Sequence, residues 1–195
     1  MSRRLIVLAA VVPQLAGANV PDLDDDTLPD QAVGASLGIA GGGRVTPGGL
    51  RVDGHYLYQL AKTDWFDGTA SFTFGSGGAA CYRDRVDDVI CDHDFTDGRG
   101  IEITAAVRRY FDAQGLYRPY ARLGVGVSLV RFGDDDVTGI AIPLHIGGGI
   151  RGAIAEQVAV VVQADLVLGL GRFERVGVEP LLGITVTAGA EFRLP

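Results

Sequence analysis

The sequence predicts an all-β fold, an eight-stranded antiparallel up-and-down barrel, and three observations support this prediction. Apolar and polar residues alternate with a period of two over nearly the whole chain, while no segment after the N-terminus has a helical period of 3.6. Short runs rich in glycine, aspartate and other turn residues separate the alternating segments. One face of every segment carries no charged residue, although 21% of the chain is charged.

The first four segments place large apolar residues on one face and small or polar residues on the other. Valine, leucine and isoleucine alternate with glycine and serine over 31–41, and leucine, valine and tyrosine alternate with arginine, aspartate and histidine over 49–60. Phenylalanine alternates with threonine and serine over 68–75, and isoleucine alternates with glutamate and threonine over 100–111. Each pattern is typical of a strand with two different faces.

The last four segments continue the pattern over greater lengths. Leucine and valine alternate with arginine, glycine and serine over 117–130, and isoleucine alternates with alanine, histidine and glycine over 139–151. Valine and leucine alternate with glutamine, aspartate and glycine over 157–170, and a similar alternation covers 181–194. A shift of one residue would exchange the two faces, so the pattern fixes which residues lie together.

The choice of the inward face decides the class of barrel. An eight-stranded interior is just wide enough to be filled by side chains or to hold one small ligand, and the apolar face has too many large side chains for it. Small residues and a compact set of charges fit such a lumen, and large aliphatic residues fit a lipid environment. We therefore expect a transmembrane barrel. The alternative is a soluble, secreted, ligand-binding barrel of the lipocalin type.

Ionisable side chains of both signs share the inward face. Because an unpaired charge is costly in a low-dielectric lumen, we expect them to form a near-neutral network that plugs the barrel. The alternative is a narrow, porin-like path for ions or small solutes. The predicted lumen network consists of Arg51, Asp53, His55, Glu102, Arg108, Arg118, Arg122, His145, Arg151, Asp165, Glu191 and Arg193.

Aromatic residues gather near the two rims of the predicted barrel, as they do at membrane interfaces. If the first strand starts in the periplasm, the inner girdle consists of Tyr56, Tyr58, Trp65, Phe66, Tyr110, Phe111, Tyr117 and Phe192. The same orientation places Phe72, Phe74, Phe132 and Phe173 toward the outer rim.

The N-terminus has the parts of a secretory signal peptide in order: Arg3 and Arg4, an apolar run, and small residues before a cleavage site after Ala18. We therefore expect a signal peptide over 1–18, a periplasmic N-terminal segment over 19–30 and the barrel over 31–195. The mature chain would carry a formal charge of 15 − 24 = −9. It has no basic stripe, so we expect no nucleic-acid partner.

The long polar link at about 76–99 is expected to be an exposed loop on the outer side. It contains both cysteines, Cys81 and Cys91, and we expect a disulfide between them because an exported chain meets oxidising conditions. His93 is the one further metal-ligand candidate nearby, so we expect no metal site. The acidic run DLDDDTLPD lacks the glycine and the glutamate of an EF-hand calcium loop.

The segment HIGGGIRG at 145–152 contains a G-x-G-x-x-G pattern, but it is expected to lie in a strand that is followed by another strand. A dinucleotide site needs a helix after the glycines, so we expect no cofactor. Catalysis of lipid hydrolysis needs a histidine, a serine and an acid together. His55 and His145 have no serine beside them in the sequence, so we expect no catalytic residues and no enzyme activity; a lipid-modifying enzyme is the alternative with the least support.

The runs RPYARLGVGVSLVRF and IPLHIGGGIRGAIAEQVAVVVQADLVLG resemble the outer membrane β-barrel domain family, which includes outer membrane protein A-type and opacity-like barrels. The resemblance covers about 100–170 and rests on Pro119, Tyr120, Gly124, Gly126, Gly147, Gly149 and Asp165. It implies an eight-stranded barrel of the Gram-negative cell outer membrane, with a structural, envelope-integrity, adhesion or host-contact role.

The expected partners are outer-membrane lipid and lipopolysaccharide, and the loop at 76–99 is the candidate site for an extracellular ligand. We expect a monomer. The chain departs from the family at its end, Phe192-Arg193-Leu194-Pro195, where the terminal aromatic residue read by the barrel assembly machinery is missing.

Overall fold

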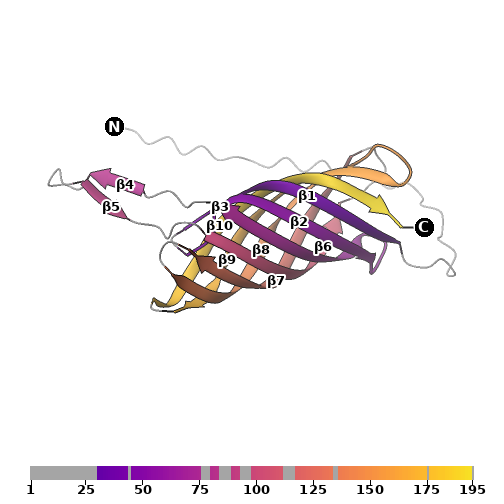
Figure 1. Cartoon of the computed structure of the whole chain (residues 1–195). Coiled ribbons are helices and arrows are strands. Elements are labelled where there is room, and N and C mark those ends of the chain that lie inside the picture. The colour runs from indigo at the N-terminus through magenta and orange to yellow at the C-terminus, as the bar shows by residue number, and fades with distance from the viewer. Residues whose placement is uncertain are drawn as a thin grey trace, which may run out of the picture.

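The computed structural model describes residues 30–43, 45–75, 80–83, 89–92, 98–111, 117–133, 136–174 and 176–194. Eight strands form a closed barrel and two form a separate hairpin (Figure 1). The barrel strands are β1 (Gln31–Gly42), β2 (Gly49–Gln59), β3 (Asp64–Gly75), β6 (Gly98–Tyr110), β7 (Tyr117–Phe132), β8 (Val137–Ala153), β9 (Val158–Phe173) and β10 (Gly177–Arg193). The hairpin strands are β4 (Ala80–Arg83) and β5 (Val89–Asp92).

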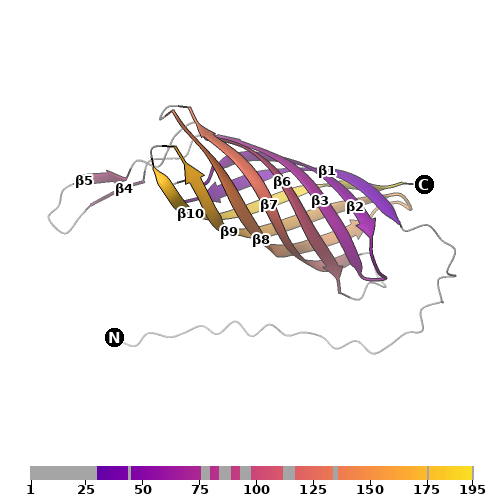
Figure 2. The ribbon, with the colours of Figure 1, turned by 90° about the horizontal axis from the view of Figure 1, so that it is seen from below.

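Each barrel strand pairs antiparallel with its neighbours in the up-and-down order, and β1 closes the barrel by pairing with β10. The β4–β5 hairpin connects β3 to β6 and lies beyond one end of the barrel, which we call the hairpin end (Figure 1). The strand β10 finishes at the opposite end, which we call the terminus end, and Figure 2 shows the same arrangement from below.

The predicted eight-stranded barrel is confirmed, with differences at strand ends. The third barrel strand begins at Asp64, whereas the sequence predicted that it would begin at residue 68. A tight turn with hydrogen bonds between Ala61 and Asp64 is sufficient to reverse the chain. The β4–β5 pair was not predicted. In the described ranges, no helix is long and apolar enough to cross a membrane.

The wall of the barrel has inverted polarity, as predicted. Large aliphatic side chains lie on the outside, among them Ile103, Leu123 and Ile184, which are all more than half exposed. Many charged and hydroxyl side chains are buried inside, and Arg108 and Asp67 are fully buried. An exterior of this kind matches lipid rather than water, because hydrocarbon accepts aliphatic side chains at no hydration cost.

An apolar cluster closes the lumen at the hairpin end. It consists of Val45, Val130, Phe132, Val137, Ala141, Phe173 and Leu181. Val45 comes from the connection between β1 and β2 and is nevertheless buried, so this connection folds across the opening. Phe132 and Phe173 are buried with their rings 6.5 Å apart, which corrects the expectation that they belong to an outer aromatic girdle. Both lie on the inward face of their strands, two residues beyond the buried positions Val130 and Gly171.

Candidate functional site

An ion cluster centred on Asp67 fills the middle of the lumen. The Oδ2 atom of Asp67, on β3, accepts hydrogen bonds from Arg108 on β6 at 2.9 Å and from Arg122 on β7 at 2.9 Å. Its Oδ1 atom accepts one from the hydroxyl of Thr69 at 2.8 Å. The side chains of Asp67 and Arg108 are 0% exposed, and that of Arg122 is 2% exposed. Such burial is tolerated because each charge has an opposite partner within hydrogen-bond distance.

Arg108 extends this cluster toward the terminus end. Its Nη1 atom donates to Oε1 of Glu191 on β10 at 2.5 Å, and its guanidinium carbon lies 4.4 Å from the centre of the Tyr120 ring. Arg151 on β8 donates to the other carboxylate oxygen of Glu191 at 2.9 Å. The cluster therefore ties together strands that are not neighbours in the barrel wall.

The glycine-rich segment of β8 makes room for these groups. Arg122 also donates to Asp165 on β9 at 3.1 Å, and a Cβ atom at Gly147 would lie 2.1 Å from the Oδ1 atom of Asp165. A Cβ atom at Gly149 would lie 2.6 Å from the hydroxyl of Tyr120. The glycines of HIGGGIRG thus permit close approach inside a strand, and β8 runs through the motif to Ala153 without a following helix.

A second ion cluster lies nearer the hairpin end. Arg51 on β2 donates to Asp53 at 2.8 Å and to Glu102 on β6 at 2.9 Å. It also donates to the hydroxyl of Ser71 on β3 at 2.6 Å. His145 on β8 is buried beside this cluster, with Nε2 3.0 Å from Oε1 of Glu102. The contact is an ion-pair distance rather than a well-formed hydrogen bond, since neither ring nitrogen has a hydrogen-bond partner among the described residues.

The charges of the lumen balance once two carboxylates are added to the predicted set. The lumen network predicted from the sequence contains six arginines and four acidic residues. The structure adds Asp67, and it adds Asp30, which forms an ion pair with Arg193 at the terminus end. Asp67 was missed because the third strand was expected to begin at residue 68. Its alternation with Thr69 and Ser71, together with the surplus of arginines, was the signal that could have found it.

Three side chains in the lumen have the residue types of a catalytic triad. The Nε2 atom of His55 lies 3.1 Å from the hydroxyl of Ser36, and its Nδ1 atom lies 3.5 Å from Asp67 and 3.1 Å from the hydroxyl of Thr69. However, Ser36 and Asp67 are buried, and Asp67 already serves two arginines. The structure has a small cavity at the terminus end of the lumen and another at the hairpin end, and neither is lined by Ser36 or His55. The arrangement therefore gives a substrate no access to the hydroxyl.

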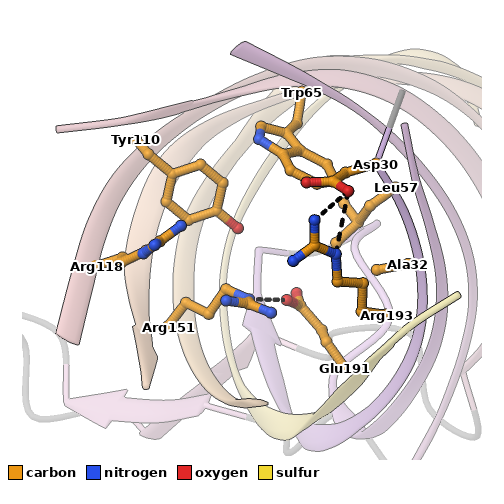
Figure 3. Close-up of a pocket in the computed structure, with 9 residues that line it drawn as sticks. All are labelled: Asp30, Ala32, Leu57, Trp65, Tyr110, Arg118, Arg151, Glu191 and Arg193. Atoms are coloured by element: carbon orange, nitrogen blue, oxygen red, sulfur yellow. Dashed lines mark hydrogen bonds and ion pairs between the residues drawn. The ribbon is translucent and has the colours of Figure 1, made fainter. Parts of the chain in front are cut away.

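A small cavity opens at the terminus end of the lumen, and we call it the mouth pocket (Figure 3). Its volume is about 60 Å³. Its lining residues are Asp30, Ala32, Leu57, Trp65, Tyr110, Arg118, Arg151, Glu191 and Arg193. The pocket brings together three arginines of the predicted network, Arg118, Arg151 and Arg193. None of them forms an ion pair with the central carboxylate Asp67.

Trp65 and Tyr110 line this pocket, which corrects their assignment to the aromatic girdle. Trp65 shares the inward face of β3 with Asp67, and Tyr110 shares the inward face of β6 with Arg108. Their rings meet edge to face at 6.3 Å, and Tyr110 packs against Tyr120 at 5.4 Å. Aromatic residues at the end of a strand therefore serve the lumen as well as the lipid interface in this barrel.

The other girdle residues lie on the outward side near the terminus end. Tyr56, Phe111, Tyr117 and Phe192 are exposed, while Tyr58 and Phe66 are partly buried. Cys81 and Cys91 lie directly opposite each other in the β4–β5 ladder. The third histidine, His93, lies outside the described residues. Within the described ranges, no group of three histidine, cysteine, aspartate or glutamate residues is arranged to hold a metal ion.

Comparisons of the fold point to one class of membrane protein, although neither a protein-family model nor the sequence of a curated protein matches this chain. Neisserial surface protein A aligns with a TM-score of 0.56 at 16% identity, over 85% of this chain and 97% of that protein. The N-terminal β-barrel domain of Pseudomonas aeruginosa OprF aligns with a TM-score of 0.53 at 15% identity, over 85% and 99%. Outer Membrane Protein W of E. coli aligns with a TM-score of 0.53 at 13% identity, over 87% of this chain and 100% of that protein. Together with the closed antiparallel sheet and its apolar exterior, these alignments show that the chain has the fold of the small eight-stranded outer-membrane β-barrels.

Proposed function

We propose that this protein is a small barrel of the Gram-negative outer membrane with a structural or surface-interaction role, and that its lumen is plugged rather than conducting. The observation that carries the proposal is the sealed centre, where Asp67, Arg108 and Arg122 are buried and bound to one another. The apolar cluster at the hairpin end adds a second barrier. Ions would have to break several buried ion pairs to pass, and such pairs are costly to break.

The terminus end faces the periplasm in this proposal, and the hairpin end faces the outside. The exposed aromatic residues near the terminus end support this, since they would mark one lipid interface. Residues 1–18 act as a cleaved signal peptide, and 19–30 form a periplasmic N-terminal segment; all but Asp30 lie outside the described residues. The β4–β5 hairpin then lies beyond the outer surface, and the loop at 76–99 that contains it is the proposed site for lipopolysaccharide or an extracellular ligand.

Neisserial surface protein A supports this role, because its fold is similar and its name places it at a cell surface. A monomer is proposed because a closed barrel leaves no unpaired strand edge for association. No cofactor or nucleic-acid partner is part of the proposal, and neither is an enzyme activity. A fluorophosphonate probe should leave Ser36 unlabelled in the folded barrel; labelling lost in Ser36→Ala would establish an accessible nucleophile and overturn this part.

Planar-bilayer recording of the purified full chain tests the plug. We expect no steady conductance from the wild-type protein, because the central ion cluster blocks the lumen. Steady openings whose size changes in Arg122→Gln or Asp165→Asn, but not in the outward-facing control Arg109→Gln, would instead establish the narrow pore. Arg109 pairs with Asp64 at an exposed site, so its replacement leaves the lumen intact.

Extraction of cell envelopes with carbonate tests the location. The proposed barrel should remain with the membranes and should migrate differently on a gel before and after heating. Release of the protein with the periplasmic fraction would favour the soluble lipocalin-type barrel and contradict a membrane role.

A further inference from the structure

The mouth pocket holds a surplus of positive charge at the edge of the sealed lumen. Three of its lining residues are arginines and two are acids, so the formal charge of the lining is 3 − 2 = +1. Figure 3 shows the three guanidinium groups reaching into one space from different strands, together with the hydroxyl of Tyr110. The whole chain, in contrast, carries a formal charge of −7.

The three arginines differ in how much of their binding capacity is already used. Arg193 pairs with Asp30, and the Nε atom of Arg151 binds Glu191 at 2.9 Å. Arg118 is exposed and forms no ion pair with any carboxylate in the described part of the chain. A guanidinium group has five N–H donors in a planar fork, which suits the paired oxygens of a carboxylate or a phosphate. Arg118, and the terminal nitrogens of Arg151, therefore have donors left for an anion.

The size and walls of the pocket limit what fits. A volume of about 60 Å³ exceeds that needed by one water, which is roughly 10–15 Å³. The pocket is thus large enough for an oxyanion group but too small for an entire sugar or peptide. Trp65 and Tyr110 form an aromatic wall on one side, which lowers the local polarity and strengthens ion pairing.

We propose that the mouth pocket binds a small oxyanion, a phosphate or carboxylate group, between the guanidinium groups of Arg118 and Arg151. The group comes either from a soluble molecule at this end of the barrel or from the headgroup of an anionic lipid in the adjacent leaflet. This site goes beyond the proposed function and does not depend on it, because the pocket remains a binding site whichever compartment it faces.

The chain supplies its own reporter for this binding. Trp65 is its single tryptophan and lines the pocket, so the intrinsic tryptophan fluorescence comes from the site itself. The experiment uses the full folded barrel in a nonionic detergent, titrated with inorganic phosphate and, separately, with sodium chloride at the same ionic strength. We expect a saturable change in Trp65 fluorescence with phosphate that chloride does not reproduce.

Arg118→Gln is the test variant, and Arg131→Gln is its matched control. Both arginines are exposed on β7, but Arg131 lies near the hairpin end. Arg118→Gln should weaken phosphate binding about tenfold, which corresponds to about 1.4 kcal/mol for one charged contact, while Arg131→Gln should bind like the wild type. Arg118→Lys should retain part of the affinity, since it keeps the charge and loses the fork.

A second arm identifies the source of the anion. Phosphatidylglycerol or phosphatidylcholine is added to the micelles in place of phosphate. A response to phosphatidylglycerol that requires Arg118 assigns the pocket to a lipid headgroup, and a response to phosphate alone assigns it to a soluble molecule. The proposal is overturned if neither anion produces a change that depends on Arg118, or if chloride reproduces the phosphate response.

Discussion

Asp67 has more partners than any other carboxylate of the described lumen. It accepts hydrogen bonds from Arg108, Arg122 and Thr69, and its side chain is fully buried. A surface ion pair on the same strand offers a direct comparison: Asp64 binds Arg109 through two hydrogen bonds at 2.6 and 2.7 Å, but the arginine is 64% exposed. The two carboxylates differ both in the number of their partners and in their exposure to solvent.

Asp67→Asn should therefore destabilise the barrel far more than Asp64→Asn. Removing one member of a buried ion pair leaves its partner uncompensated and costs about 3–5 kcal/mol. Loss of an exposed pair costs about 0–1 kcal/mol because water and salt already screen it. Urea unfolding of the folded barrels in lipid vesicles, followed by circular dichroism, measures both changes in the free energy of unfolding. Equal losses in the two variants would contradict a sealed lumen.

Gly147 tests the steric account of the glycine-rich motif. A methyl group at this position would overlap the backbone oxygen of Ala164 and the carboxylate of Asp165, each at 2.1 Å. Gly147→Ala should cost about 1–3 kcal/mol, the usual penalty for overpacking. Gly54→Ala is the control, because the nearest atom to its new methyl group lies 4.0 Å away. The same vesicle unfolding experiment should find Gly54→Ala close to the wild type; a neutral Gly147→Ala would refute the steric account.

At the scale of elements, the β4–β5 hairpin gives the two cysteines a defined relationship. Residues that face each other in an antiparallel ladder have Cα atoms about 4.5–5.5 Å apart, which is within the range that a disulfide spans. Cys81 and Cys91 occupy such a pair of positions. The predicted disulfide is therefore compatible with the backbone register.

We expect this disulfide in protein purified from an oxidising compartment. Alkylation without reduction should leave both cysteines unmodified, and mass spectrometry after reduction should find both labelled. Cys81→Ser should expose one reactive thiol and leave the stability of the barrel unchanged, because the hairpin is a separate sheet. Full alkylation before reduction would show that the thiols are free.

The sequence predicted the strands well because each strand has one face toward lipid and one toward the lumen. The errors fall where this contrast ends. Trp65 and Asp67 belong to the inward face of β3, yet an aromatic residue near an acid and a glycine has the composition of a turn at the membrane interface. Tyr110 was assigned to the girdle from its place near the end of the strand, although its alternation with Arg108 puts it on the inward face of β6. Which inward side chains meet across the lumen depends on the register between neighbouring strands around the whole barrel. The sequence of a single strand does not determine that register.

At the scale of the whole molecule, the lumen is organised in layers along the barrel. From the hairpin end these are the apolar cluster, the ion cluster of Arg51 and Glu102, the ion cluster of Asp67, the aromatic residues and the mouth pocket. A soluble barrel would have its apolar residues in the middle of this column. Here ion pairs occupy the middle of the column instead, so the stability of the barrel depends on these ion pairs as well as on the lipid outside.

Dependence on lipid leads to a prediction for two isoleucines that are similarly exposed but lie at different depths. Ile103 lies in the middle of β6 and is 70% exposed, whereas Ile154 lies in the turn between β8 and β9 and is 67% exposed. In water the replacement of either by arginine would be nearly neutral. In a bilayer, Ile103→Arg should cost about 2–4 kcal/mol and Ile154→Arg about 0–1 kcal/mol, because the penalty for a charge falls toward the interface. Urea unfolding in vesicles and in detergent-free buffer measures the free energy of unfolding in both environments. A loss of stability confined to Ile103→Arg in vesicles requires hydrocarbon around the middle of the barrel. Two neutral substitutions would instead place the apolar wall in water.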